Sequence, residues 1–230
     1  MKKVCITQSN YIPWKGYFKN IADVDVFVVY DDAQYTRRDW RNRNLIKSPD
    51  GLKWLTIPVE VKGKFHQKIS ETQISNTNWP LDHLKTLKHF YSKALHYKEV
   101  KSLIEEWYLS VPATNLSEVN CHFIKRICSY YNINTEIVSS NTLTFEGDKT
   151  TKLVNICTQL NATDYFTGPA AKSYLDEVQF STNGINVHYF NYEGYQTYNQ
   201  LYPPFMHEVT ILDMMFNIGD GGRDFFVAGT

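Results

Sequence analysis

The sequence has no excess of charge of either sign. Its 24 Lys and Arg residues balance its 24 Asp and Glu residues. Because no net field surrounds such a protein, the composition excludes a general affinity for nucleic acid or for an anionic membrane surface. Any contact with tRNA would have to be local.

Long apolar runs and paired cysteines are also missing. No run approaches the ~20 apolar residues of a membrane span, and the chain enters a predicted strand at once, without a signal peptide. The four cysteines, at 5, 121, 128 and 157, show no CxxC pair and no metal-ligand spacing. Cys121 and Cys128 would lie about 10 Å apart along one helix, too far for a disulfide. We therefore expect reduced thiols in a cytoplasmic protein that has no membrane partner.

The composition is sufficient for one well-packed domain. The 230 residues are 43% hydrophobic and 15% aromatic, and 16 of them are tyrosines. This supports a single domain over residues 1–230. Tyrosine is common in wet, aromatic-lined pockets that stack sugars, although most of the 16 need only fill half-buried positions.

Short apolar runs alternate with helical patterns along most of the chain. Residues 4–6 and 26–30 are predicted strands, with a helix between them that follows Pro13 and Gly16. Gly16 would let the backbone approach a ligand. Further strands are predicted at 135–139, 164–167 and 185–190, and further helices at 149–160, from Gly168 onward and at 208–218. This order predicts an α/β fold with a largely parallel, Rossmann-like sheet.

Two segments interrupt the alternation. Residues 53–61 and 69–75 predict two strands of a hairpin within 47–75, which would form a wall or lid over a site. Pro58 either places the first strand at a sheet edge or ends it early. Residues 79–133 instead predict three helices, a helical insertion or cap, and Asn115 caps the third. The histidines in this segment, at 83, 89, 96 and 122, are expected at the surface or at an interface.

Carboxylates and guanidinium groups gather directly after the second predicted strand. The segment holds Asp31, Asp32, Arg37, Arg38, Arg41 and Arg43, interleaved with Trp40, Asn42 and Asn44. An open α/β sheet binds its ligand at the carboxyl ends of its strands, so we expect these groups to converge on one cleft. Such a cleft suits a polyanion that carries a group to be deprotonated. The alternative is a solvated charged face.

Two later segments are weaker candidates. Gly168 and Lys172 flank a strand-to-helix junction that would bind an anion, although an ordinary connection explains it equally well. The Tyr- and Pro-rich segment 192–205 is predicted to be a functional loop, with Tyr198 and Gln200 in contact with substrate. Asp213 is expected to be exposed or paired with a buried arginine.

Several short motifs together resemble the WbqC-like family. They lie at 10–14, 16–18, 31–34, 42–47, 54–58, 168, 174–176, 198–200 and 211–219. The resemblance covers nearly the whole chain and associates it with bacterial O-antigen and other surface-polysaccharide gene clusters. It implies a glycine transferase that acylates the amine of a nucleotide-linked sugar.

Amide formation of this kind needs a base for the amine and donors for the developing oxyanion. The predicted catalytic residues are Asp31, Asp32, Gln8 and Gln34. The predicted substrate-binding residues, with no metal ligand among them, are Asn10, Tyr11, Trp14, Arg38, Arg41, Asn42, Arg43, Asn44, Gly168, Lys172, Tyr198 and Gln200. The donor would be an aminoacyl-tRNA, or an aminoacyl-adenylate made in place from ATP with Mg²⁺.

Two other functions fit the same residues. The first strand, loop and helix are similar to the start of the class I nucleotidyltransferase and aminoacyl-tRNA synthetase (HUP-like) fold, but Tyr17 replaces a histidine that contacts ATP phosphates there. A non-catalytic sugar-nucleotide-binding partner is the other possibility. The family commonly has His-Gln-Pro where this chain has Thr7-Gln8-Ser9, so a histidine base is missing. The sugar, the donor and the oligomeric state stay open.

Overall fold

A central sheet of five parallel strands organises the protein. The computed structural model describes residues 1–112 and 114–227. The strand order is β5-β2-β1-β6-β7, with bounds β1 Lys3–Thr7, β2 Val26–Val29, β5 Glu136–Ser139, β6 Asp164–Thr167 and β7 Asn186–Tyr189. In register, Val4 of β1 is opposite Val26 of β2, and Lys3 is opposite Asp164 of β6. The predicted parallel α/β sheet is confirmed.

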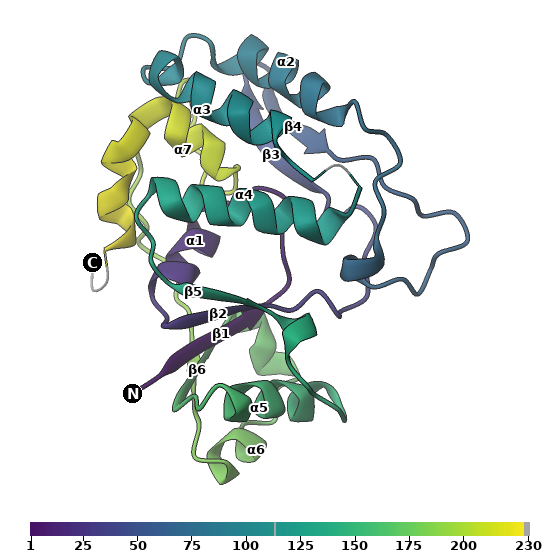
Figure 1. Cartoon of the computed structure of the whole chain (residues 1–230). Helices are drawn as coiled ribbons and strands as arrows, with labels where there is room; N and C mark the ends of the chain where they lie inside the picture. The colour runs from purple at the N-terminus through teal and green to yellow at the C-terminus, as the bar shows by residue number, and fades with distance from the viewer. Residues whose placement is uncertain (113, 228–230) are drawn as a thin grey trace.

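Helices cover both faces of this sheet. In Figure 1, α1 (Lys15–Ala22) and α4 (Leu116–Tyr130) lie on one side, and α5 (Lys149–Gln159) and α6 (Glu177–Thr182) on the other. Alternation along β1 explains the two layers, because Cys5 belongs to one buried cluster while Val4 and Ile6 belong to the other.

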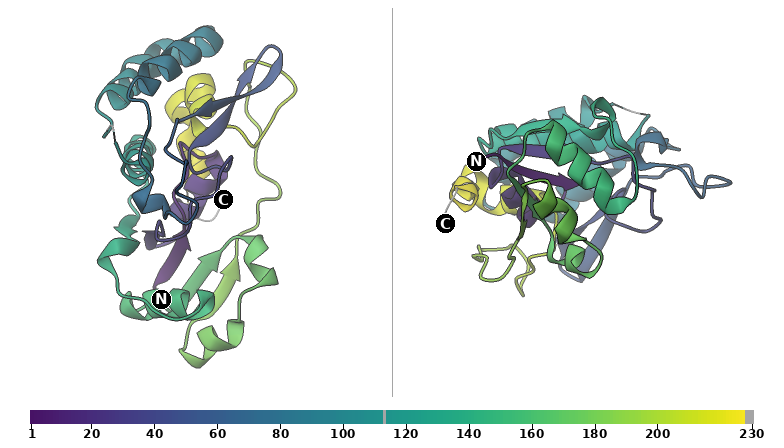
Figure 2. Two further views of the ribbon diagram at one scale, coloured as in Figure 1. Left: turned by 90° about the vertical axis from the view of Figure 1, so that its right-hand side faces the viewer. Right: turned by 90° about the horizontal axis from the view of Figure 1, so that it is seen from below.

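The larger cluster extends beyond the sheet. The helices α2 (Trp79–Tyr91), α3 (Tyr97–Leu109) and α7 (Ile211–Ile218) lie near the hairpin of β3 (Arg43–Ser48) and β4 (Gly51–Thr56), as Figures 1 and 2 show. The three helices predicted within 79–133 are present. Asn115 caps α4 as predicted, since its Oδ1 accepts a hydrogen bond from the amide of Glu118 at 3.2 Å. Asp148 caps α5 in the same way, from Thr151 at 2.8 Å.

Three element predictions are wrong, and a fourth is wrong in its first residue. The hairpin lies earlier than 47–75, because β4 pairs with Arg43–Ser48. The charged and amide residues of Arg43–Ser48 do not form the apolar pattern that predicts a strand. Residues 69–75 form a 3₁₀ turn, Ile69–Glu71, and isolated bridges in place of a strand. After Gly168 the chain forms a short 3₁₀ helix, Pro169–Ser173, before α6 begins. The last helix starts at Ile211 because Thr210 caps it.

His83 contradicts its predicted surface position. It is 6% exposed, and its Nδ1 lies 2.8 Å from the hydroxyl of Tyr11, which also bonds the hydroxyl of Tyr108 at 2.7 Å. Burial lowers the pKa of His83 to about 4, so the ring is neutral at pH 7. The chain of hydrogen bonds joins α2 and α3 to the loop after β1.

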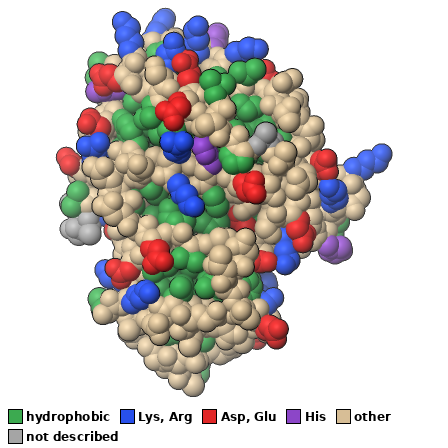
Figure 3. Space-filling view, in the orientation of Figure 1, with side chains coloured by type: hydrophobic (Ala, Val, Ile, Leu, Met, Phe, Trp, Pro, Cys, Tyr) green, Lys and Arg blue, Asp and Glu red, His purple; other side chains and the backbone are tan. Residues whose placement is uncertain are grey.

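The surface agrees with the balanced composition. On the face in Figure 3, Lys and Arg side chains alternate with Asp and Glu, and the cations are densest over α2 at the upper edge. All four cysteines are free thiols, as predicted. None of the described helices combines the length and apolarity that crossing a bilayer requires.

Candidate functional site

Two distant side chains fix the loop between β1 and α1. Asn44 Nδ2 donates to the carbonyl oxygens of Tyr11 at 3.1 Å and Ile12 at 2.9 Å, and Thr210 Oγ1 donates to that of Ile12 at 2.7 Å. Ile12 has a φ of 38°, which is strained for a β-branched residue. These hydrogen bonds hold the strained turn that carries Asn10 and Trp14.

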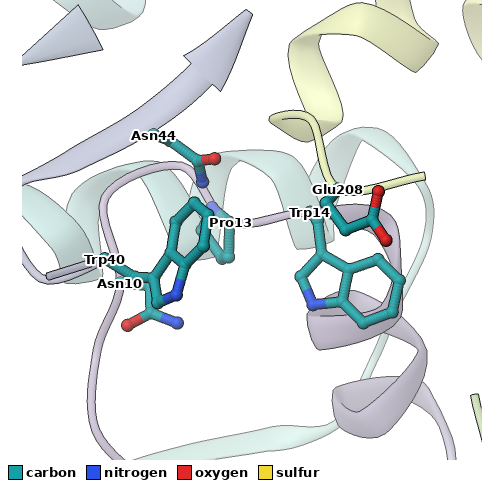
Figure 4. A pocket seen from close by; sticks show the side chains of 6 residues that line it. All are labelled: Asn10, Pro13, Trp14, Trp40, Asn44 and Glu208. Carbon is teal, nitrogen blue, oxygen red and sulfur yellow. The ribbon is translucent and has the colours of Figure 1, made fainter. Parts of the chain in front are cut away.

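A small cavity opens beside this loop. Its volume is about 170 Å³, and its lining residues are Asn10, Pro13, Trp14, Trp40, Asn44 and Glu208. Figure 4 shows the indoles of Trp14 and Trp40 on either side of Pro13, with the Glu208 carboxylate beside Trp14. The volume is below the ~300–1,000 Å³ typical of drug-sized ligands, so the cavity suits one ring.

Gly16 makes room for one wall of the cavity. A Cβ atom at position 16 would lie 2.3 Å from the indole of Trp14. The glycine therefore accommodates this chain's own tryptophan, and Trp14 in turn presents its ring to the cavity.

Arg41 orients the polar wall. Its Nη1 donates to Asn10 Oδ1, and its Nη2 lies 3.7 Å from the carboxylate of Asp39. With Oδ1 occupied, the NH₂ group of Asn10 is the part left to donate to a ligand. Arg41 thus acts on the cavity through Asn10.

Glu208 supplies the carboxylate of the cavity. It is exposed and lies two residues before the Thr210 cap of α7. Among residues 1–112 and 114–227, it forms no hydrogen bond or ion pair. A carboxylate that lines a cavity together with two indoles and an amide NH₂ can pair with an ammonium group and accept its proton.

Asp31 faces inward and is fully engaged. It is 3% exposed and accepts hydrogen bonds from Ser9 N at 2.8 Å, Ser9 Oγ at 2.7 Å and Ser117 Oγ at 2.5 Å. Asn120 Nδ2 extends the network by donating to Ser9 Oγ and to the carbonyl of Arg41, each at 2.9 Å. A proline in place of Ser9 could not donate the first bond. Asp31 therefore ties β1 and β2 to α4.

Asp32 opens into a different groove. Lys68 Nζ lies 2.8 Å from its Oδ1, and Ser140 Oγ donates to its Oδ2 at 2.9 Å. Burial alone would raise the pKa of this carboxyl, but the hydrogen bonds and charge of Lys68 and the bond from Ser140 lower it below the ordinary value. The groove, about 480 Å³, also contains Tyr30, Phe145 and Lys152. None of its lining residues lines the Trp14 cavity.

The arginines are dispersed as well. Arg37 Nη2 donates to the carbonyl of Val61 at 2.6 Å, and Arg37 and Gln34 line a third depression. Arg43 donates to the carbonyl of Arg38, and its guanidinium carbon lies 3.9 Å from the centre of the Trp54 ring. The expectation that the aspartate pair and the arginines converge on one cleft is therefore wrong, because backbone carbonyls and serine hydroxyls engage them separately.

Two further predicted contacts have internal partners. The hydroxyl of Tyr11 bonds His83 and Tyr108. The side chain of Asn42 donates to the carbonyl of Ile57 at 2.8 Å. Both residues hold the loops that carry the cavity.

Tyr198 and Gln200 converge on a buried carboxylate. Asp213 is 0% exposed and accepts from Tyr198 Oη at 2.7 Å, Tyr91 Oη at 2.9 Å and Gln200 Nε2 at 2.9 Å. Burial raises the pKa of Asp213, and the bonds from Tyr198, Tyr91 and Gln200 limit that rise. No arginine contacts it in the described part of the chain, so the predicted pairing is wrong.

Two buried lysines hold the same loop. Lys47 Nζ donates to Gln200 Oε1 at 2.9 Å and to the carbonyls of Tyr202 and Pro204. Lys15 Nζ donates to the carbonyl of Gln196 at 2.5 Å and lies 4.8 Å from the ring centre of Phe225. Burial lowers the pKa of Lys15 to about 8, although Asp213 opposes the change. These contacts fix the segment that precedes Glu208.

Tyr192 lies between α1 and the loop after β6, where an open α/β sheet usually binds nucleotides. The strand order reverses between β1 and β6. Tyr192 Oη accepts from Asn20 Nδ2 of α1 at 3.0 Å and lies 3.6 Å from the Cβ position of Gly168.

Gln8 accepts from Tyr17 through its backbone carbonyl at 3.0 Å. Lys172 is exposed, with its ammonium 4.9 Å from the Tyr189 ring centre.

The cavity lining includes three residues that the sequence predicted as substrate-binding and two important ones that it did not. Asn10, Trp14 and Asn44 were predicted, whereas Trp40 and Glu208 were not. Trp40 had a signal, since a tryptophan within a polar, arginine-rich loop is an unusual surface residue. Glu208 had none, because a lone glutamate before a helix is ordinary.

The fold and the cavity define an open α/β protein with an aromatic pocket at the loop after its first strand. Within the described residues, no group of three or more His, Cys, Asp and Glu could hold a metal ion. The model of the WbqC-like protein family matches residues 8–224, and the chain belongs to this family.

A relative has no assigned activity. The chain is 49% identical over 225 residues to "Uncharacterized protein Rv1507c" of Mycobacterium tuberculosis (strain ATCC 25618 / H37Rv), and the match covers 98% of this chain and 97% of the relative. No solved structure matches the chain.

Proposed function

We propose that the protein is an aminoacyltransferase that forms an amide on the amine of a sugar held between Trp14 and Trp40. One observation carries the proposal: two indoles, the Asn10 amide and the Glu208 carboxylate line one ring-sized cavity. Indoles stack on the apolar face of a sugar ring, and the amide and carboxylate supply directional polar contacts.

In this proposal Glu208 takes the role that was predicted for Asp31 and Asp32. It pairs with the sugar ammonium and accepts its proton, and the neutral amine then attacks the acyl carbonyl of an activated aminoacyl donor. The new C–N bond replaces the bond to the donor's leaving group, and the second amine proton departs with that group or passes to solvent. The Asn10 NH₂ is placed to donate to a sugar hydroxyl or to the developing oxyanion.

The support for a sugar substrate comes from the resemblance to the WbqC-like family. That resemblance implies that the sugar is linked to a nucleotide. Asp31 and Asp32 lie outside the cavity lining. Their residue types alone do not distinguish a catalytic carboxylate from a structural one.

Mass spectrometry tests the proposal directly. Free and nucleotide-linked amino sugars are incubated with the protein, glycine, ATP and glycine-charged tRNA, and the products are searched for a sugar heavier by one glycyl group. Glu208→Gln should lower the product rate by about 100-fold or more, as for loss of a general base. The exposed Glu193→Gln should have no effect. A Glu208→Gln protein with full activity would refute the assignment, and sugar binding without any product would indicate a binding role.

A further inference from the structure

The Trp14 cavity continues onto an exposed aromatic surface. Trp40, which lines the cavity, is 38% exposed, and Trp54 of β4 is 44% exposed. Their ring centres are 5.3 Å apart with an angle of 46° between the planes. Large aromatic side chains that stay exposed next to a cavity mark a binding surface.

Trp54 is held in place before any ligand arrives. The guanidinium carbon of Arg43 lies 3.9 Å from its ring centre, and Arg43 is itself anchored by a hydrogen bond to the carbonyl of Arg38. Arg43 and Trp54 lie on neighbouring strands of the hairpin, two ladder positions apart. A fixed ring loses little conformational freedom when a ligand stacks on it.

The spacing of the two indoles suits rings that follow one another closely. In a glycan, consecutive sugar rings are joined through a single oxygen atom. In a nucleotide-linked sugar, a ribose and two phosphates separate the sugar ring from the base. Adjacent indoles at 5.3 Å match the first arrangement.

The arginines near the cavity also favour a second sugar ring over a diphosphate. Arg41 is committed to Asn10 and Asp39, and Arg43 to Trp54 and the carbonyl of Arg38. In the part of this loop that the structure describes, Arg38 is the guanidinium group without a hydrogen bond or ion pair. A diphosphate would therefore depend on Arg38, whereas a second sugar ring would depend on Trp54.

We propose that Trp40 and Trp54 form a second sugar subsite, so that the acceptor is the end of a glycan of at least two sugar rings. The inference rests on the proposed function, since the first ring is the amino sugar between Trp14 and Trp40. It replaces the nucleotide carrier with a neighbouring sugar.

Isothermal titration calorimetry with defined sugars tests the subsite. The probes are glucosamine and galactosamine, their β-linked disaccharides, and the corresponding uridine-diphosphate sugars. Wild-type protein should bind a disaccharide about tenfold more tightly than its monosaccharide, as one added ring contact allows. Trp54→Ala should abolish that gain and leave monosaccharide affinity unchanged. Arg38→Gln tests the competing diphosphate contact and should change neither quantity if the second ring is a sugar.

The outcomes separate the two proposals. Monosaccharide binding with no gain for any disaccharide overturns the subsite while leaving the first pocket standing. A gain seen with uridine-diphosphate sugars and lost in Arg38→Gln also overturns it, in favour of a nucleotide carrier. Failure of every probe to bind overturns both. Circular dichroism confirms that the Trp54→Ala protein is folded.

Discussion

Replacing Asp31 by Asn distinguishes a structural carboxylate from a catalytic one. Asp31 accepts three hydrogen bonds, from Ser9 N, Ser9 Oγ and Ser117 Oγ, in a site where it is 3% exposed. Asn keeps one acceptor oxygen but turns an NH₂ group toward the two hydroxyls. Ser9 Oγ already accepts from Asn120 and is poorly placed to accept again.

The expected cost follows from those bonds. Hydrogen bonds to a charged group contribute about 1.5–3 kcal/mol each, and rotation of the Ser117 hydroxyl recovers part of the loss, so we expect Asp31→Asn to reduce the free energy of unfolding by about 2–4 kcal/mol. For a chain of this size, that lowers the melting temperature by roughly 5–15 °C. Where the variant is folded, its sugar affinity should stay within about threefold of wild type, because Asp31 does not line the cavity.

Chemical denaturation and calorimetric melting measure the effect. Asp50→Asn is the matched control, since the Asp50 side chain is 81% exposed and should change stability by no more than about 0.5 kcal/mol. An Asp31→Asn protein that melts with the wild type but loses activity would refute the structural role and restore Asp31 as the base.

Two pH effects follow from buried groups. The pKa of Asp213 is raised by burial, so the unfolded state loses this proton first and the folded state becomes less stable as the pH rises from about 3.8. Asp213→Asn should remove that slope. Subtracting the two unfolding free energies measured between pH 4 and 8 isolates it, and a constant difference contradicts the reasoning. Burial lowers the pKa of His83 to about 4 against an ordinary value of 6.5, so its contribution is present above pH 6.5 and lost as the pH falls toward 4. NMR of the imidazole should show a neutral ring at pH 5, and His83→Gln should flatten the acid limb of the stability curve; a ring that titrates near 6.5 would disprove it.

The sheet and most helices could be predicted because their signals are local. Residues 164–167 include Tyr165, Phe166 and Thr167, which are residue types that favour a strand. The Asn115 and Asp148 caps depend on amides three residues away. The strand Arg43–Ser48 escaped prediction because its polar residues bond other segments of the fold: Asn44 holds the carbonyls of Tyr11 and Ile12, and Lys47 those of Tyr202 and Pro204. The burial of His83 could not be predicted for the same reason, because its hydrogen-bond partner Tyr11 lies far away in the sequence.

From its residue order alone, the chain specified a parallel α/β sheet, three added helices, reduced thiols and a polar loop after the second strand. Each of these depends on periodicity, capping or composition within a short stretch. Tertiary structure decided that Asp31 faces inward, that Asp32 opens elsewhere, and that Trp14, Trp40 and Glu208 meet around one cavity. Residues so far apart in the sequence are brought together by loops that distant side chains hold through hydrogen bonds. The local sequence around a carboxylate or a tryptophan is the same whether that side chain binds a ligand or stabilises the fold.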